Sequence, residues 1–189
     1  MSAAAEVHPN ATLTPSKLDL LAAWLPTQEW FRGDAADLER LAFFRFVDPD
    51  GEVGLDCMIL ASQGSVYHVP VTWRSAPLPG ATLIGTLEHS VLGTRYCFDA
   101  ATDPVYVAVV TDVIHAAGTD ADIVAVGESE PRQKLVLVTG SGVDAGARTD
   151  DELRVVHVLD GTWPDATARL SGTWEQDGKR RTDVLAVLD

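Results

Sequence analysis

The sequence has few basic residues and no long apolar run. Lysine and arginine together number 14, against 28 aspartates and glutamates, which gives a formal net charge of −14. A surface this acidic disfavours nucleic acids and anionic membranes as partners, because both attract basic surfaces. No apolar run approaches the length that crosses a bilayer. We therefore expect no nucleic-acid partner and no association with a membrane.

Cysteine is also scarce. The two cysteines, Cys57 and Cys97, lie far apart and no C-x-x-C pair occurs. Zinc knuckles and redox pairs use closely spaced cysteines, so neither is indicated. The first residues lack the basic and apolar regions of a secretory signal, and the sequon at Asn10 is therefore without consequence. We expect two buried free thiols in a cytoplasmic protein.

Apolar residues are abundant, at 46% of the chain, which is enough for a sizeable core. Runs rich in aromatic and β-branched residues alternate with polar turns and predict strands. Only two segments have helical character. This pattern predicts an α+β fold with a large, mostly antiparallel sheet and two main helices. The expected strands are 41–47, 54–62, 66–74, 82–91, 93–100, 122–127, 134–140, 153–159, 166–175 and 182–188.

Capping signals mark the two helices. Thr14 or Ser16 can cap the first, and Asp19 follows Ser16 at the spacing of a capping box. Asp103 is a candidate cap for the second helix, and Gly118 is its expected stop. The many β-branched residues of the second segment lower its helix propensity, but the end signals favour a helix.

A glycine-rich stretch resembles a dinucleotide site. Residues 140–145 fit the G-x-G-x-x-G/A fingerprint, and Asp160 follows at a suitable distance. However, a helix with an apolar face must follow this loop, and the acidic segment 144–153 has none. We therefore expect a hairpin loop between strands 135–139 and 153–159, and no cofactor.

Other catalytic patterns are lacking. There is no G-x-S-x-G, and the Walker-like segment 172–180 has no Ser or Thr after Lys179. The acidic turn 48–52 departs from the spacing of a calcium loop. We expect no catalytic residue and no metal site. The histidines also lack ligand spacing; they are His8, His68, His89, His115 and His157.

The most polar strand pair is the candidate binding region. Glu88, His89, Arg95 and Tyr96 would converge if 83–90 and 94–100 form a hairpin. Such a cluster could bind an anion or a sugar hydroxyl. It could equally be a solvated set of cross-strand charges.

Four segments together resemble the N-terminal cap domain of actinobacterial maltokinases. In that family the cap, a small sheet packed with helix, precedes a kinase body similar to aminoglycoside phosphotransferases, and the whole enzyme phosphorylates maltose with ATP. The resemblance covers residues 16–117. The segments are WLPTQEWF (24–31), VYHVPVTWRSAPLPGA (66–81), LIGTLEHSVLGTRYCFDA (83–100) and DPVYVAVV (103–110).

The sequence departs from the family after the cap. Its only later H-x-x-D, from His157 to Asp160, lacks the spacing of a phosphotransferase catalytic loop. Phosphoryl transfer needs a held nucleotide, magnesium and a base, and no residues can be assigned to these roles. We therefore expect a flexible tail at 1–13, a cap-like region at 14–117 and a β-rich extension of the same domain at 118–189.

These observations favour a stand-alone, non-catalytic binding or regulatory protein, which the resemblance links to α-glucan, trehalose or maltose metabolism. One alternative is a small-ligand-binding protein or an enzyme that uses a concave sheet face. Another is an accessory subunit of a separately encoded sugar kinase or α-glucan enzyme. The candidate ligand-binding residues are His89, Arg95, Trp73 and Arg74.

Overall fold

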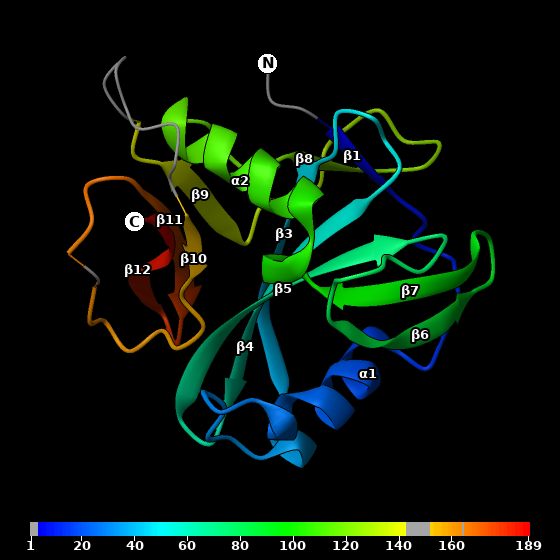
Figure 1. Ribbon diagram of the computed structural model, residues 1–189, viewed down its shortest axis with the longest axis horizontal. Helices are drawn as coiled ribbons and strands as arrows, with labels where there is room; N and C mark the ends of the chain where they lie inside the picture. The colour runs from blue at the N-terminus through cyan, green and yellow to red at the C-terminus, as the bar shows by residue number, and fades with distance from the viewer. Residues whose placement is uncertain (1–3, 143–151, 164) are drawn as a thin grey trace.

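The computed structural model describes residues 4–142, 152–163 and 165–189. Half of the described strands belong to an antiparallel six-stranded sheet with the order β2-β6-β7-β5-β4-β3 (Figure 1). Its core is the β3-β4-β5 meander, in which each strand pairs with the next along the chain. The six strands are β2 (Leu13–Thr14), β3 (Glu39–Val47), β4 (Gly54–Ser62), β5 (Ser65–Arg74), β6 (Leu83–His89) and β7 (Gly93–Asp99).

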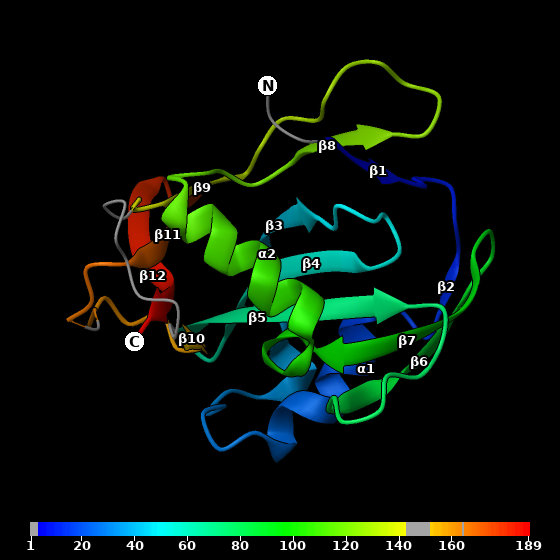
Figure 2. The ribbon, with the colours of Figure 1, turned by 45° about the horizontal axis from the view of Figure 1, so that its top comes forward.

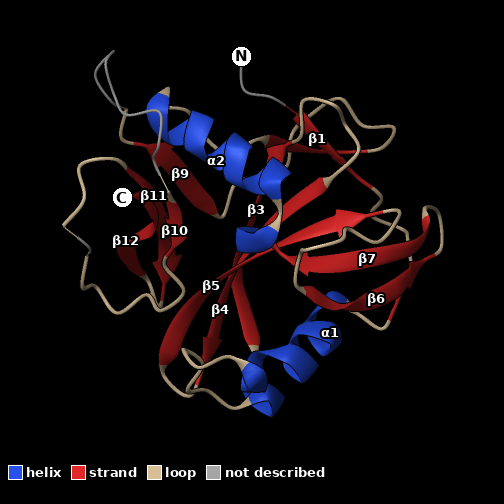
Figure 3. Ribbon diagram, in the orientation of Figure 1, coloured by secondary structure: helices blue, strands red, loops and turns tan. Residues whose placement is uncertain are grey.

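The remaining strands form two smaller sheets (Figure 3). One is antiparallel with the order β10-β12-β11-β9, and the other pairs β1 with β8 in parallel. The predicted α+β class with mostly antiparallel pairing is confirmed, although the strands divide among three sheets. The elements are β1 (Ala4–Val7), β8 (Asp122–Ala125), β9 (Val136–Gly140), β10 (Leu153–Val155), β11 (Arg169–Gln176) and β12 (Lys179–Leu188).

Both predicted helices form. In α1 (Lys17–Trp24), the Ser16 hydroxyl accepts a hydrogen bond from the Asp19 backbone and the Asp19 carboxylate accepts one from the Ser16 backbone, so the capping box is complete. In α2 (Pro104–His115), Asp103 accepts from the Val105 amide. Short 3-10 helices η1 (Leu25–Thr27), η2 (Ala35–Asp37) and η3 (Ala100–Thr102) complete the helical structure. No helix among the described residues is long and apolar enough to cross a membrane.

Side chains along β5 point alternately to the two faces of the sheet, and each face packs in its own core. Val69, Val71 and Trp73 pack with α1, whereas Val66 packs in the core that contains α2. Figure 2 shows α2 lying across one side of the β3-β4-β5 meander, near β9. The α2 core also takes in apolar residues of β9, β11 and β12, so segments far apart in the sequence share it. Cys57 and Cys97 are free and buried, as predicted.

From residue 4 onward, the segment expected as part of a flexible tail at 1–13 contains strand residues. Ala4–Val7 form β1 in register with Asp122–Ala125 of β8, and the Arg45 guanidinium donates to the Glu6 carbonyl over 2.9 Å. Leu13 and Thr14 also pair with β6. An alanine-rich stretch of this length has no strand signal of its own, so its structure depends on partners distant in sequence.

The glycines of the apparent dinucleotide fingerprint have a packing role. A Cβ on Gly140 would lie 2.1 Å from the Val113 carbonyl oxygen, so only glycine fits against α2 here. The Gly142 amide donates to the Ile114 carbonyl over 2.9 Å. This is the C-terminal end of the helix, whose partial charge is negative and repels a phosphate.

The expected hairpin between strands 135–139 and 153–159 is wrong. β9 pairs with β11, and β10 pairs with β12, so the two strands are not neighbours in their sheet. The strand expected at 153–159 also ends at Val155. The predicted loop itself falls mostly on residues 143–151, which lie outside the described residues.

Candidate functional site

The predicted β6–β7 hairpin forms, but its four polar residues lie on two faces. Arg95 is opposite Leu87 and Thr94 is opposite Glu88 in the register. Opposed residues share a face and neighbours alternate, so His89 and Arg95 lie on one face while Glu88 lies on the other with Tyr96. Glu88 instead accepts a hydrogen bond from the Thr94 hydroxyl over 2.7 Å.

The turn of this hairpin determines the tautomer of His89. Its Nδ1 accepts hydrogen bonds from the backbone amides of Val91 and Leu92, each over 3.2 Å. Because both partners are donors, Nδ1 carries no proton and Nε2 does. Burial lowers the pKa of His89, and the nearby positive groups of His8, Lys17 and Arg95 lower it further. The side chain is therefore a neutral imidazole whose Nε2–H is a hydrogen-bond donor.

Arg95 is held by the same turn. Its Nη2 donates to the Leu92 carbonyl over 2.8 Å. Its Nε is buried and has no hydrogen-bond partner among the described residues. A buried donor without a partner costs about 1–3 kcal/mol, so a ligand oxygen at this position would relieve that cost.

His89 and Arg95 both line a groove of about 740 Å³, as does Trp73. The groove runs between β1, the start of α1, the β3–β4 turn and the β6–β7 hairpin. Three of the four predicted site residues therefore come together. The side chains that supply its charge and its donors are Glu6, His8, Lys17, Arg45, Asp48, Glu52, Trp73, His89 and Arg95.

Arg74, the fourth predicted site residue, is not part of this groove. It follows Trp73 in β5 and therefore points to the opposite face of the sheet. Its Nε and Nη2 donate to the two carboxylate oxygens of Asp103 over 2.8 and 2.7 Å, and Thr72 donates to the same carboxylate. Arg74 thus supports the cap of α2, and its prediction as a ligand-binding residue is unsupported by its position.

A buried carboxylate lies beneath the groove. Asp56 contacts Lys17 Nζ at 2.5 Å and Arg45 Nε at 2.7 Å, and its side chain has no exposed surface. Burial alone would raise the pKa of Asp56, but the charges of Lys17 and Arg45 outweigh it and hold the pKa below its ordinary value. The Trp73 indole N–H lowers it further. The carboxylate is therefore ionised and anchors two cations at the groove floor.

Sequence analysis missed Asp56, Lys17 and Arg45. A signal was present, because Asp56 is a lone acid and Arg45 a lone base in two apolar strands joined by a short turn. The register confirms that these two residues are directly opposite each other. An acid and a base at matched positions of a buried hairpin indicate an internal ion pair.

Donors occupy the interior of the groove, and carboxylates occupy its rim. Lys17, Arg45 and Arg95 are half-buried, whereas Glu6 and Glu52 are exposed. The remaining acid is Asp48. Its carboxylate accepts hydrogen bonds from the backbone amides of residues 50, 52 and 53 over 2.9–3.1 Å, so its oxygens already have partners. Such an interior suits an anionic group or an oxygen-rich ligand. No group of residues in the described ranges could hold a metal ion.

Comparison with known protein families identifies part of the chain. Residues 24–103 match the family model of the maltokinase N-terminal cap domain. No curated protein and no solved structure matches the chain. The matched segment runs from the end of α1 to the cap of α2, and it contains Trp73, His89 and Arg95. The resemblance seen in the sequence is thereby confirmed: residues 24–103 of this chain form a maltokinase-cap-like region.

Proposed function

We propose that this chain is a non-catalytic, cap-like binding protein whose groove recognises a small anionic sugar derivative. One observation carries the proposal: hydrogen-bond donors collect in the interior of one groove of a protein whose net charge is −14. Because the molecule as a whole repels anions, donors gathered at one place point to a local role. The resemblance to a maltokinase cap region supports a role in α-glucan, trehalose or maltose metabolism.

The donors favour an anion, and the rim favours hydroxyl groups. Arg95 has an Nε–H without a hydrogen-bond partner in the described part of the chain, and His89 presents an Nε2–H. Charge-assisted hydrogen bonds from such groups bind phosphate and carboxylate oxygens strongly. Glu6 and Glu52 at the rim can accept hydroxyl protons. A phosphorylated sugar satisfies both parts of the groove.

The groove residues support binding without catalysis. His89 cannot act as a general base, because Nδ1 already accepts two backbone amides and Nε2 carries the proton. Lys17 and Arg45 are held by Asp56. No serine, threonine or cysteine is among the described residues that line the groove, so a side-chain nucleophile of those types is not in place.

Calorimetric titration tests the proposal, with trehalose phosphate, glucose phosphate, their unphosphorylated sugars and inorganic phosphate as ligands. We expect a phosphorylated sugar to bind at least tenfold more tightly than its unphosphorylated form. Arg95→Gln should weaken that binding by about 10–100-fold, the loss of one charge-assisted contact. The matched control is Arg180→Gln at the exposed start of β12, which should bind as the native protein does. Equal affinity for both forms of the sugar, or an unaffected Arg95→Gln variant, would contradict the proposal.

A second candidate function is that of an accessory subunit of a sugar kinase. The turn beside the groove exposes Val91 and Leu92, which are 59% and 45% exposed. Apolar side chains at a hairpin tip suit a protein contact. Size-exclusion chromatography with a purified sugar kinase body tests this role. A complex that is lost in the double variant Val91→Ser and Leu92→Ser would support it, and no complex would exclude that kinase as partner.

A further inference from the structure

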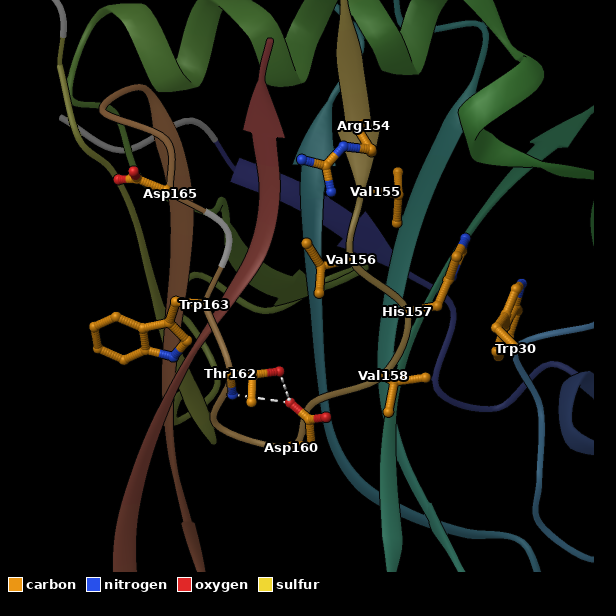
Figure 4. Close-up of a pocket in the computed structure, with 10 residues that line it drawn as sticks. All are labelled: Trp30, Arg154, Val155, Val156, His157, Val158, Asp160, Thr162, Trp163 and Asp165. Carbon is orange, nitrogen blue, oxygen red and sulfur yellow. Dashed lines mark hydrogen bonds between the residues drawn. The ribbon is translucent and has the colours of Figure 1, made fainter.

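A second hollow lies outside the groove. It has a volume of about 690 Å³ and shares no lining residue with the groove. It is formed by the end of β10 and the residues that follow it, by residues 160–163 and 165, and by Trp30 (Figure 4). Most of it therefore comes from the part of the chain that the cap-domain match does not cover. Its lining residues outside the floor are Trp30, Arg154, His157, Asp160, Thr162, Trp163 and Asp165.

One wall is a fixed aromatic pair. The rings of Trp30 and His157 stack with centroids 4.2 Å apart and planes within 4° of parallel. The partner of His157 Nδ1 is the His68 carbonyl oxygen at 3.0 Å, so Nδ1 carries the proton and donates. Burial lowers the pKa of His157, which keeps the ring neutral near pH 7 with Nε2 as an acceptor. In Figure 4 the two rings stand beside Val158.

The other side carries the most exposed tryptophan of the described chain. Trp163 is 51% exposed, whereas Trp24, Trp73 and Trp174 are at most 9% exposed. Figure 4 shows Trp163 and Thr162 on the loop across from His157, with Val156 between the two sides. An indole left in water loses the burial that normally stabilises it, so its placement beside a hollow indicates a ligand surface.

The charges of the hollow disfavour an anion, and they disfavour a cation at the Trp163 ring. The carboxylates of Asp160 and Asp165 repel an anion, and Arg154 is already paired with Asp189 over 2.6 Å. The Arg169 guanidinium lies 5.9 Å from the Trp163 ring centre, so it repels a second cation at that ring. A neutral ligand with apolar faces and hydroxyl groups avoids both the repulsion by the carboxylates and the repulsion by Arg169.

We propose that this hollow binds a neutral oligosaccharide. The C–H face of a sugar ring packs on Trp163 or on the Trp30–His157 pair, and valines form the apolar floor. The carboxylates of Asp160 and Asp165 and the Nε2 of His157 accept hydroxyl protons. The hollow is open to solvent, so the ligand lies along its surface rather than inside an enclosed cavity. This inference does not depend on the groove, because the two sites use different residues.

Tryptophan fluorescence and saturation-transfer NMR test this site, with maltohexaose and cellohexaose as probes. We expect at least one of them to quench or shift the emission and to show ring-proton saturation. Trp163→Ala should weaken binding at least tenfold, and Trp163→Phe should retain most of it, because phenylalanine keeps an aromatic face. Trp163 is exposed, so neither change should unfold the protein, which circular dichroism checks.

Two controls make the result specific. Leu137→Ala removes an equally exposed apolar side chain on β9, and Arg95→Gln alters only the groove. Both should bind the oligosaccharide as the native protein does. Failure of both oligosaccharides to bind, or unchanged binding by Trp163→Ala, would overturn the proposal. Neither result bears on phosphorylated sugars in the groove.

Discussion

At the scale of single residues, Asp56 is the group on which the groove depends. It is fully buried and neutralises Lys17 and Arg45 at once. Asp56→Asn leaves two cations without their counter-charge beneath the groove, which should lower the free energy of unfolding by about 3–5 kcal/mol. Urea denaturation followed by circular dichroism measures the change.

The exposed pair of Arg154 and Asp189 offers a matched control. Both side chains are about half exposed, so Asp189→Asn should leave the urea midpoint unchanged within error. An Asp56→Asn variant as stable as the native protein would show that the buried cluster contributes nothing to folding. Because the folded pKa of Asp56 is depressed, its contribution is complete above the unfolded pKa and disappears as the pH falls through the folded value.

His68 makes the stability of the fold depend on pH in the same direction. Burial, with a smaller contribution from His157, lowers the pKa of His68 from 6.5 to about 3. Below pH 6.5 the unfolded chain binds a proton that the folded protein excludes. Stability should therefore fall by about 2 kcal/mol between pH 7 and pH 5. Urea denaturation at both pH values should show a smaller loss in His68→Gln, and an equal loss would contradict this assignment.

Residue types predicted part of the site. The polar hairpin sequence pointed to His89 and Arg95, which line the groove together with Trp73. Arg74 does not line the groove because adjacent strand residues face opposite sides, and sequence alone did not show which side was hollow. Lys17 could not be placed, because only the packing of α1 against the sheet brings it to Asp56.

At the scale of elements, the two helix-capping side chains differ in the number of interactions that they make. Ser16 is a local cap, so Ser16→Ala should cost about 1 kcal/mol. Asp103 caps α2 and also pairs with Arg74, and its side chain has no exposed surface. Asp103→Ala should therefore cost more, about 2–4 kcal/mol. Thermal and urea unfolding of the two variants compare the costs, and equal costs would show that the Arg74 pair adds no stability.

The contact between β9 and α2 depends on the absence of a side chain. An alanine Cβ at position 140 would lie 2.7 Å from the Ile114 Cα, a backbone atom that cannot move freely. Gly140→Ala should destabilise the protein by about 1–3 kcal/mol. Gly118→Ala is the control, since its nearest neighbour would be at 3.4 Å. Calorimetric melting that shows Gly140→Ala to be as stable as this control would contradict the packing role.

Local signals predicted elements better than their partners. The caps at Ser16 and Asp103 and the β6–β7 turn are encoded within a few residues and form as predicted. The pairing of β9 with β11 skips over β10 and could not be read from neighbouring strands. β1 likewise acquires its structure from β8, which is more than a hundred residues away.

At the scale of the whole molecule, the two cores support different parts of the surface. The α2 core joins the meander to β9, β11 and β12, and it holds the Arg74–Asp103 pair at its edge. The face that carries α1 holds Asp56 and supports the groove. Substitutions that loosen the α2 core should therefore affect stability first, whereas changes at Arg95 should affect ligand binding at unchanged stability.

The most direct test of this account is a ¹⁵N NMR titration with trehalose phosphate that follows the side-chain signals of the groove. We predict saturable shifts of Arg95 Nε–H, His89 Nε2–H and Trp73 Nε1–H, and a newly protected Arg95 Nε–H as it gains an acceptor. The Trp174 indole signal, which belongs to the other core, should stay in place. If the protein is saturated with trehalose phosphate and none of the three groove signals moves, or only Trp174 shifts, the account is contradicted.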